Sequence, residues 1–424
     1  MKTKSNKRIN SFLLGSLIFT LSALLFACEE DSVTEDNGNL PDISGYPVVS
    51  TNQTTFYGSS TEISEPSGGE SFYGQDANYS RNELNYVDNG DGTVTDMVTG
   101  LMWSQSIDMD GDGDIDADDK MTYDEAVAEA ESFELADHTD WRLPTIKELY
   151  SLIIFSGQDP SGYEGTSTSG LVPFIDTDYF GFDYGDTDAG ERIIDAQYAS
   201  STKYVDYTMA GDETLFGVNF ADGRIKGYGL EVMGSDKEFF VAYVRGNTDY
   251  GINDFSDNGD GTITDNATGL MWMQGDNGEG LTWEEALSYA ENLDYAGHTD
   301  WRLPDIKELQ SIVDYTRSPE TTSSAAIDAI FSCTQIFNEG QEVDYPYYWS
   351  GTTHANYNGF GDGACYVSFG RAMGYMGQWI DVHGAGAQRS DPKVGDPNDY
   401  PEGHGPQGDA IRIYNYVRCV RTVN

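Results

Sequence analysis

The chain has 424 residues and carries 72 Asp and Glu against 23 Lys and Arg, a formal net charge of −49 at pH 7. Such a charge repels phosphate backbones and argues against nucleic-acid binding. Aromatic residues make up 13% of the chain, which is too much apolar surface for a disordered acidic protein. At about 400 residues the chain is long for a single core, so two or three domains are expected.

Residues 1–27 have the pattern of a secretory signal. The first ten are basic and polar, and residues 12–27 are almost wholly apolar. An apolar segment of about 16 residues is shorter than the roughly 20 that a membrane helix needs. The signal ends LFAC at residues 25–28, which resembles a bacterial lipobox.

The lipobox resemblance implies a lipidated Cys28 at a new N-terminus. The protein would then be attached to a membrane through its lipid anchor only. The protein is therefore predicted to be located in the cell envelope. The acidic residues 29–31 resemble the surface-export tags of some Gram-negative lipoproteins, which implies the outer membrane with surface exposure. Ordinary cleavage, with Cys28 unmodified, is the alternative.

Residues 28–45 are rich in Asp, Glu, Asn, Ser and Gly without an apolar period, and they are expected to form a flexible acidic tether. Aromatic residues return from Tyr46 onward. That stretch is expected to pack against the first of two domains as irregular strands.

The rest of the chain contains one module twice. Residues 88–103, DNGDGTVTDMVTGLMW, recur at 257–272 as DNGDGTITDNATGLMW, and residues 138–149, HTDWRLPTIKEL, recur at 298–309 as HTDWRLPDIKEL. A weaker echo pairs YVR at 243–245 with YVR at 416–418. A period of roughly 170 residues is too long for a solenoid and indicates a tandem duplication. The predicted domains are 46–250 and 251–424, the second with a long loop at 379–410.

Both copies predict the same local elements. The DNGDG turns are typical of hairpins, and TGLMW predicts a second strand. Capping boxes at Thr122–Glu125 and Thr282–Glu285 predict helices of about 11 residues. Further boxes at 145–148 and 305–308 open second helices. The fold class is therefore α+β, with two helices packed on an antiparallel sheet in each domain.

These motifs together resemble the Lcl C-terminal domain family, named from a collagen-like bacterial adhesin. The order of elements is also similar to the C-type-lectin-like fold. The resemblance implies two tandem lectin-like domains and cell-surface recognition or adhesion, with glycan binding shown for some members. The best-known binding mode in the family uses sulfated polysaccharides, from which a strongly acidic chain departs, because sulfates and surface carboxylates repel each other unless a cation bridges them.

An insertion in the first copy predicts a calcium site. Residues 108–119 read DMDGDGDIDADD, with glycine at loop position 6 and an apolar residue at position 8. Calcium takes six to eight oxygen ligands, and alternate carboxylates can converge on it while glycine permits the turn. The candidate ligands are Asp108, Asp110, Asp112, Asp114, Asp116 and Asp119.

The role expected for this ion is structural, because a single loop has no partner hand to move. Asp119 stands where such loops usually carry a bidentate glutamate. A solvated acidic loop is the alternative. The second copy has only GDNGE at 275–279, so no equivalent site is expected there.

The segment 379–393, WIDVHGAGAQRSDPK, has no counterpart in the first copy. Long loops on a rigid scaffold commonly carry binding residues. Hydrogen-bonding groups for a sugar are expected from Asp381, His383, Arg389 and Asp391, and a stacking face from Trp379 or Tyr375. The alternative is a loop that only covers the edge of the domain.

Three cysteines follow Cys28, namely Cys333, Cys365 and Cys419. An exported chain with three cysteines is expected to hold one disulfide and one free thiol, with three possible pairings. We expect Cys365–Cys419, because both lie on strand-like segments and both are absent from the first copy.

The sequence contains no nucleophile elbow, phosphate loop, zinc-type spacing or dinucleotide fingerprint. The expected function is non-catalytic: a surface-anchored recognition protein that binds a glycan or a surface protein and contains a structural calcium loop. A structural or assembly component of an envelope complex is the alternative, and an enzyme on a lectin-like fold is the third.

Overall fold

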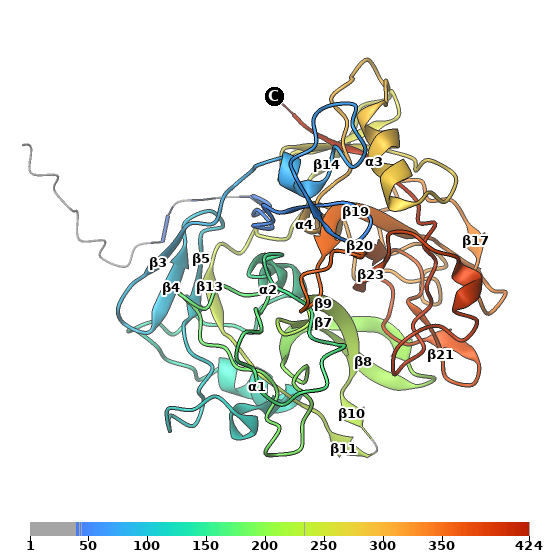
Figure 1. Cartoon of the computed structure of the whole chain (residues 1–424). Coiled ribbons are helices and arrows are strands. Elements are labelled where there is room, and N and C mark those ends of the chain that lie inside the picture. Colours follow the sequence, from blue (N-terminus) through green and yellow to red (C-terminus); the bar gives the residue numbers. More distant parts are fainter. Residues whose placement is uncertain (1–39, 42, 44, 233, 424) are drawn as a thin grey trace, which may run out of the picture. The chain divides into compact units, whose positions relative to one another are not determined.

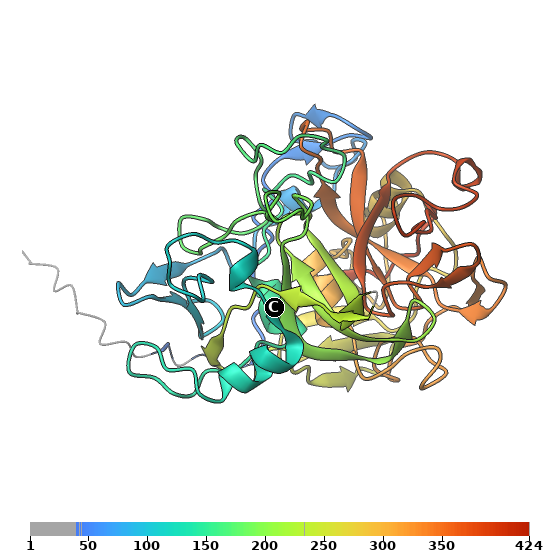
Figure 2. The same ribbon diagram turned by 90° about the horizontal axis from the view of Figure 1, so that it is seen from below.

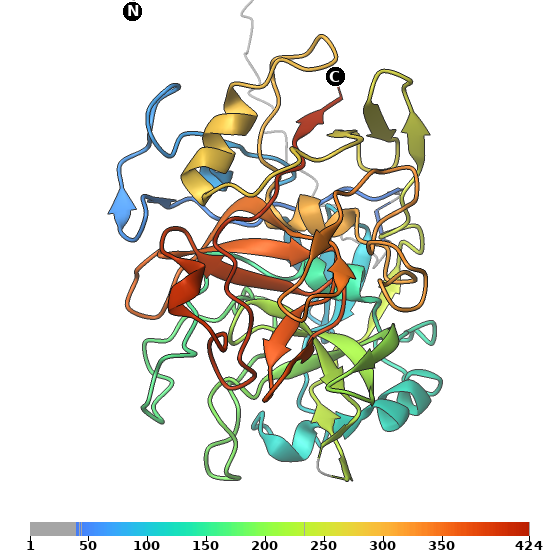
Figure 3. The same ribbon diagram turned by 90° about the vertical axis from the view of Figure 1, so that its right-hand side faces the viewer.

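One antiparallel sheet of six strands contains strands from both repeats, in the order β19-β20-β23-β9-β8-β7 (Figures 1 and 3). The computed structural model describes residues 40–423 except 42, 44 and 233, so the signal, Cys28 and nearly all of the tether lie outside the described residues. The first repeat supplies β7 (Gln197–Thr208), β8 (Asp212–Asn219) and β9 (Arg224–Gly229). The second supplies β19 (Tyr347–His354), β20 (Gly363–Ser368) and β23 (Gln388–Pro392).

The two halves of this sheet meet where Gln388 of β23 pairs with Ile225 of β9. Figure 2 shows the green strands of the first repeat beside the orange and red strands of the second. Equivalent strands occupy equivalent places on either side of this antiparallel junction. The duplication is therefore built around an approximate two-fold axis that passes between β9 and β23.

Each repeat also forms a four-stranded antiparallel sheet, with the orders β13-β5-β4-β3 and β14-β15-β16-β24. In the first repeat the strands are β3 (Tyr86–Asp88), β4 (Thr93–Asp96), β5 (Leu101–Ser104) and β13 (Val244–Gly246). In the second they are β14 (Phe255–Asp257), β15 (Thr262–Asp265), β16 (Leu270–Met273) and β24 (Val420–Thr422). The predicted DNGDG hairpins and TGLMW strands are confirmed.

The pairing in these sheets corrects one expected correspondence between the repeats. Val244 pairs with Trp103, and Val420 pairs with the equivalent Trp272. The counterpart of residues 244–245 is therefore 420–421, and the expected match to 417–418 is wrong. The YVR string occurs at residues 243–245 and again at 416–418. The hydrogen-bond register, however, places the second VR pair near the C-terminus, residues 420–421, in the strand equivalent to β13.

The capping boxes predicted from the sequence open all four α-helices of the described residues. Thr122, Thr145, Thr282 and Asp305 each accept a hydrogen bond from the backbone N–H three residues on, and a glutamate returns the bond. The helices are α1 (Tyr123–Ala130), α2 (Ile146–Ser151), α3 (Trp283–Glu291) and α4 (Ile306–Ser311). At eight and nine residues, α1 and α3 are shorter than expected.

Short two-stranded ribbons and single 3₁₀ turns complete the fold. The ribbons pair β1 (Phe56–Tyr57) with β2 (Glu62–Ile63), β6 (Met121–Thr122) with β12 (Glu238–Phe239), β10 (Glu231–Val232) with β11 (Ser235–Asp236), β17 (Ile336–Phe337) with β18 (Val343–Asp344), and β21 (Met373–Tyr375) with β22 (Trp379–Asp381). The 3₁₀ turns are η1 (Asp76–Asn78), η2 (Ala117–Asp119) and η3 (Pro397–Asp399). No helix among the described residues is long and apolar enough to cross a membrane.

The two repeats share their largest hydrophobic core. One cluster of buried side chains includes Trp103 and Leu149 from the first repeat together with Trp272 and Leu309 from the second. Two smaller clusters lie beneath α1 and α3, one in each repeat. Residues 40–424 accordingly form one compact unit.

Segment 46–83 contacts the first repeat, as expected, through bonds such as that from the Phe155 N–H to the Thr51 carbonyl, and it also contacts the second repeat extensively. The buried Asp76 accepts hydrogen bonds from the hydroxyls of Thr51 (2.8 Å) and Thr352 (2.6 Å). Phe72 stacks on Trp283, and Arg81 forms an ion pair with Glu308. A buried carboxylate needs hydrogen-bond donors. The segment supplies one from Thr51, and the second repeat supplies the other from Thr352.

Two equivalent lysines of the IKEL motifs reach across to the opposite repeat. Lys147 Nζ donates to the carbonyl of Ser311 (2.8 Å), and Lys307 Nζ donates to the carbonyls of Ser151 (2.8 Å) and Ser50 (3.0 Å). Ser151 and Ser311 are the last residues of α2 and α4, which contact each other. Carbonyls at a helix C-terminus lack intrahelical donors and carry partial negative charge. Each lysine therefore caps the helix of the other repeat.

We predict that Lys307→Met destabilises the protein. The substitution removes the donor from two carbonyls of a buried region, and an unpaired buried polar group costs about 1–3 kcal/mol. Chemical denaturation of the soluble chain should show a loss in this range. Lys203→Met is the matched control, because the Lys203 side chain is 38% exposed and its ion pair with Glu213, which is 60% exposed, lies near the surface.

The wild type and Lys307→Met also allow a test of how stability depends on pH. Burial lowers the pKa of Lys307 to about 7, although Asp305, Asp96 and Asp76 oppose the shift. Above pH 7 the unfolded chain therefore binds more protons at this lysine than the folded chain does, and stability rises with pH. The stability of the wild type relative to Lys307→Met should increase by about 2 kcal/mol from pH 7 to 9. A decrease over this range would contradict the assignment.

Candidate functional site

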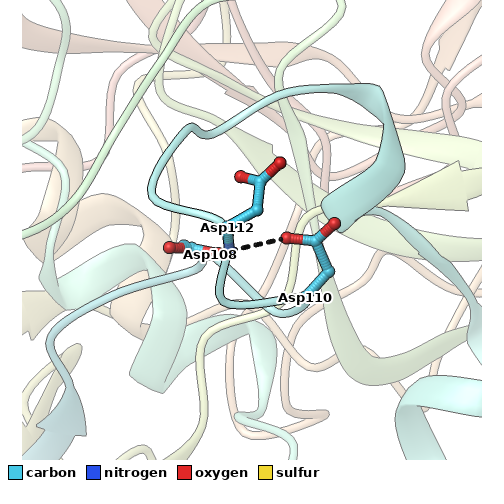
Figure 4. A group of neighbouring side chains, drawn as sticks. All are labelled: Asp108, Asp110 and Asp112. Carbon is cyan, nitrogen blue, oxygen red and sulfur yellow. Dashed lines mark hydrogen bonds between the residues drawn. The ribbon is translucent and has the colours of Figure 1, made fainter.

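The Asp-rich insertion forms a turn that gathers three carboxylates. Asp108, Asp110 and Asp112 each offer one oxygen, and these oxygens lie within 4.8 Å of one another (Figure 4). Gly111 and Gly113 adopt left-handed backbone angles, with φ of 76° and 100°, which residues with a side chain rarely adopt. The glycines therefore allow alternate aspartates to face the same point.

Asp119, at loop position 12, closes this turn. It is only 2% exposed. Its Oδ1 accepts a hydrogen bond from the N–H of Met109 (2.6 Å), and its Oδ2 accepts one from the N–H of Asp116 (2.9 Å). Asp116 caps η2 by accepting from the N–H of Asp118. Of the six predicted ligands, the structure thus gathers three and uses two others to hold the loop, and Asp114 is not in the gathered group.

The donor set of this turn fits a hard cation such as calcium, which takes carboxylate oxygens. The gathered charges repel one another: although a backbone hydrogen bond from Asp112 lowers the pKa of Asp110, desolvation and the charges of Asp112, Asp119 and Asp108 raise it overall. A bound cation would remove that repulsion. At the equivalent place of the second repeat, Asp276 instead accepts hydrogen bonds from the backbone and hydroxyl of Thr334 and from the hydroxyl of Tyr348.

The five residues predicted to contact a ligand separate into two groups. Trp379 and Asp381 lie in β22, where Trp379 packs against Tyr375 and Asp381 accepts a hydrogen bond from the Tyr204 hydroxyl (3.0 Å). Arg389 and Asp391 lie in β23 and line a cleft, and the buried His383 lies behind Arg389. The predicted segment therefore supplies part of one concave site and part of a separate hairpin.

The cleft lies over the junction of β9 and β23 and has a volume of about 820 Å³. Alternate residues of β9 line it, because side chains two apart face the same side of a strand. The first repeat contributes Asp159, Tyr163, Arg224, Lys226 and Tyr228, and the second contributes His354, Tyr357, Tyr366, Arg389, Asp391 and Asp409. The cleft exists only because the two repeats share one sheet.

The rim of the cleft carries an aromatic pair with one member from each repeat. The rings of Tyr163 and Tyr357 meet edge to face with centroids 5.4 Å apart, and both are half-buried. Backbone hydrogen bonds fix this contact: the N–H of Asp159 donates to the carbonyl of Ala355 (2.8 Å), and the N–H of Tyr357 donates to the carbonyl of Asp159 (3.0 Å). The rim is therefore a built surface that belongs to both repeats.

Ion pairs cover the floor of the cleft. Arg224 contacts Asp159 (2.6 Å), Lys226 contacts Asp222 (2.7 Å), and Arg389 contacts Asp409. Burial raises the pKa of Asp159 and Asp409, but the neighbouring cations outweigh it, and the pKa of each carboxyl lies well below its usual value. Both carboxylates are therefore charged at neutral pH.

His354 is neutral at this site. Burial and the Arg224 charge lower its pKa to about 4, although Asp159 and Asp222 oppose the shift. Its Nε2 lies 2.9 Å from the carbonyl oxygen of Asp222, and its Nδ1 lies 2.9 Å from Ser390 Oγ. A carbonyl can only accept, so Nε2 carries the proton and Nδ1 accepts from the serine.

The first-repeat residues of the cleft were missed by the sequence analysis. The alternation of Arg224, Lys226 and Tyr228 in RIKGYG is a signal for a polar strand face. No local pattern shows that this face adjoins β23, because the partner strand lies more than 150 residues away, at 388–392.

The described cysteines form no disulfide, and the expected Cys365–Cys419 bond is absent. Cys333, Cys365 and Cys419 are all free thiols. Cys365 belongs to the core that the repeats share, whereas Cys419 belongs to the smaller cluster beneath α3. The two side chains therefore pack in separate hydrophobic clusters.

Comparison with known proteins identifies the family. The family model described as the Lcl C-terminal domain matches residues 92–245 and 261–381, well over half of the chain. No curated protein and no solved structure gave a significant match. The two matched segments follow the two repeats of the structure, and the chain belongs to the Lcl C-terminal domain family as a tandem pair.

Proposed function

We propose that this chain is a non-catalytic recognition protein that binds a glycan in the cleft between its repeats. The observation that carries the proposal is the cleft itself, a concave site of about 820 Å³ with a fixed aromatic rim and a polar floor. Ligand sites are typically clefts of about 300–1,000 Å³ with a few well-placed polar groups. A sugar ring presents an apolar face for the tyrosines and hydroxyls for the floor.

The carboxylates of the cleft support binding rather than hydrolysis. A glycosidase needs one carboxylic acid and one carboxylate free to act on either side of the scissile bond. Asp159 and Asp409 are paired with arginines. Asp391 is 1% exposed and accepts hydrogen bonds from the N–H groups of Arg412 and Ile413 and from the Asn415 amide. Asp159, Asp391 and Asp409 are thus engaged in holding the structure of the site, and Asp362, the fourth carboxylate that lines the cleft, is exposed.

We predict that Tyr163→Ala combined with Tyr357→Ala weakens glycan binding at least tenfold. The double variant removes the aromatic surface of the rim, and stacking on an aromatic ring contributes about 1–3 kcal/mol in comparable sites. A glycan array identifies the ligand of the wild-type soluble chain, and calorimetry then compares the affinities.

Tyr207→Ala combined with Tyr414→Ala is the matched control, because these tyrosines are 61% and 47% exposed and lie outside the cleft. The control should bind like the wild type. Absence of any glycan ligand on the array would reject the proposal and favour a structural or assembly role in the cell envelope. A protein partner that binds without involving the cleft tyrosines would reject it as well.

We also propose that the Asp-rich turn binds a structural calcium ion. Asp108, Asp110 and Asp112 would hold it, and the ion would neutralise their mutual repulsion. Asp110→Ala combined with Asp112→Ala should lower the melting temperature relative to the wild type in millimolar calcium. In EDTA the two proteins should melt alike.

The control for calcium is Asp178→Ala combined with Asp188→Ala, which removes two exposed carboxylates from another acidic loop. That variant should keep the full calcium-dependent rise of the wild type. If calcium raised the melting temperature of the Asp110/Asp112 variant as much as that of the wild type, the turn would be a solvated acidic loop.

The proposal places the protein on the outer membrane, exposed at the surface and anchored through a lipid on Cys28. It is supported by the lipobox-like residues 25–28 and the acidic residues that follow. Cells that express the full chain should incorporate a labelled fatty acid into it, and Cys28→Ser should abolish the label. Equal labelling of the variant would exclude this anchor.

A further inference from the structure

We infer that the cleft selects uncharged, polyhydroxylated ligands and disfavours anionic ones. The inference rests on the proposed function, since it names the class of glycan that the same site binds. It follows from how the charged side chains of the cleft are paired and from the charge of the whole chain.

Two arginines oppose each other at the centre of the site. The antiparallel pairing of Gln388 with Ile225 places the neighbouring residues Arg389 and Arg224 opposite each other. Side chains alternate between the faces of a strand, so both arginines lie on the face that lines the cleft. Like charges directly opposite each other in a sheet are destabilising unless they are neutralised.

Each of these arginines has its own carboxylate. Asp159 pairs with Arg224, and Asp409 pairs with Arg389. The carboxylates come from loops of the two different repeats, so the neutralisation is repeated on both sides of the junction. Of the other cations that line the cleft, Lys226 pairs with Asp222, which also contacts Arg224 (3.3 Å), and Arg192, whose side chain is 61% exposed, pairs with Asp195.

Each Lys and Arg side chain that lines the cleft therefore has a carboxylate partner. To bind Arg224 or Arg389 at the centre of the site, an anionic group would have to displace a carboxylate that is 12% or 14% exposed, and a buried charge left without its partner is costly. The net charge of −49 also repels an anion before it arrives. Both effects act against sulfated and uronate-containing chains.

A hydroxyl group meets neither obstacle. Guanidinium groups offer five N–H donors, and carboxylates offer about four lone-pair sites. The Arg224–Asp159 and Arg389–Asp409 pairs are 11–14% exposed and line the cleft with donors and acceptors side by side. A hydroxyl is both a donor and an acceptor, so it can bridge such a pair without disturbing its charge balance.

The test compares neutral and anionic oligosaccharides on the soluble wild-type chain. The neutral probes are hexasaccharides of glucose, mannose and xylose, and each is paired with its chemically sulfated form. Heparin and oligogalacturonate serve as additional anions. At least one neutral probe should bind at least tenfold more tightly than its sulfated form, with an affinity that changes less than twofold between 50 and 500 mM NaCl.

A charge-changing variant gives a second readout. Asp409→Asn releases the positive charge of Arg389, and it should shift the ratio of anionic to neutral affinity at least tenfold towards the anion. Asp300→Asn is the matched control, because it releases Arg421 from a similar ion pair outside the cleft. If Asp409→Asn does not fold, as judged by its melting curve, Asp159→Asn removes the nearer of the two carboxylates that contact Arg224 and should shift the ratio in the same direction.

The outcomes separate the two proposals. Tighter binding of sulfated or uronate ligands, with an affinity that falls as salt increases, would overturn the inference and leave glycan recognition in place. An unchanged ratio in Asp409→Asn would also overturn the inference. Binding of none of these saccharides, together with an empty glycan array, would overturn the proposed function and the inference with it.

Discussion

The pairing of β9 with β23 is the constraint on which the rest of the structure depends. It joins two three-stranded halves into one sheet, places Arg224 opposite Arg389 and creates the cleft above them. Elsewhere in the unit, the exchanged lysines Lys147 and Lys307 hold α2 and α4 together. Burial of one shared core makes these contacts mutually dependent, because neither repeat can keep its half of the sheet or its helix end satisfied without the other.

The repeats have diverged mainly outside this shared region. The first carries the Asp-rich turn and the second carries the long loop after β22, whereas the capping boxes and hairpins are retained in both. Tyr163 and Tyr357 show how the site uses both repeats, since each ring comes from a different one and backbone bonds between the repeats hold them together. Recognition would then be a property of the pair, and the Asp-rich turn would support only the first repeat.

Local signals in the sequence predicted local structure well. Thr122, Thr145, Thr282 and Asp305 open helices where their capping boxes indicated, because a cap depends on residues three apart. Three features could not be predicted: the joined sheet, the path of segment 46–83 and the separation of Cys365 from Cys419. They depend on contacts between residues more than 50 positions apart, for which one sequence carries no signal. Arg389 and Asp391 were found from their unusual loop, whereas Arg224 lay in an ordinary strand pattern.

The approximate two-fold axis between β9 and β23 also has an evolutionary consequence. A single repeat that bound a copy of itself through this edge would form an isologous dimer, in which the two walls of the cleft must be identical. Fusion of the copies into one chain removes that identity requirement. Tyr163 and Asp159 on one side could then change independently of Tyr357 and Asp409 on the other, so a symmetric groove could become one with a distinct direction. A linear polymer with two different ends is the kind of partner that such a groove can read.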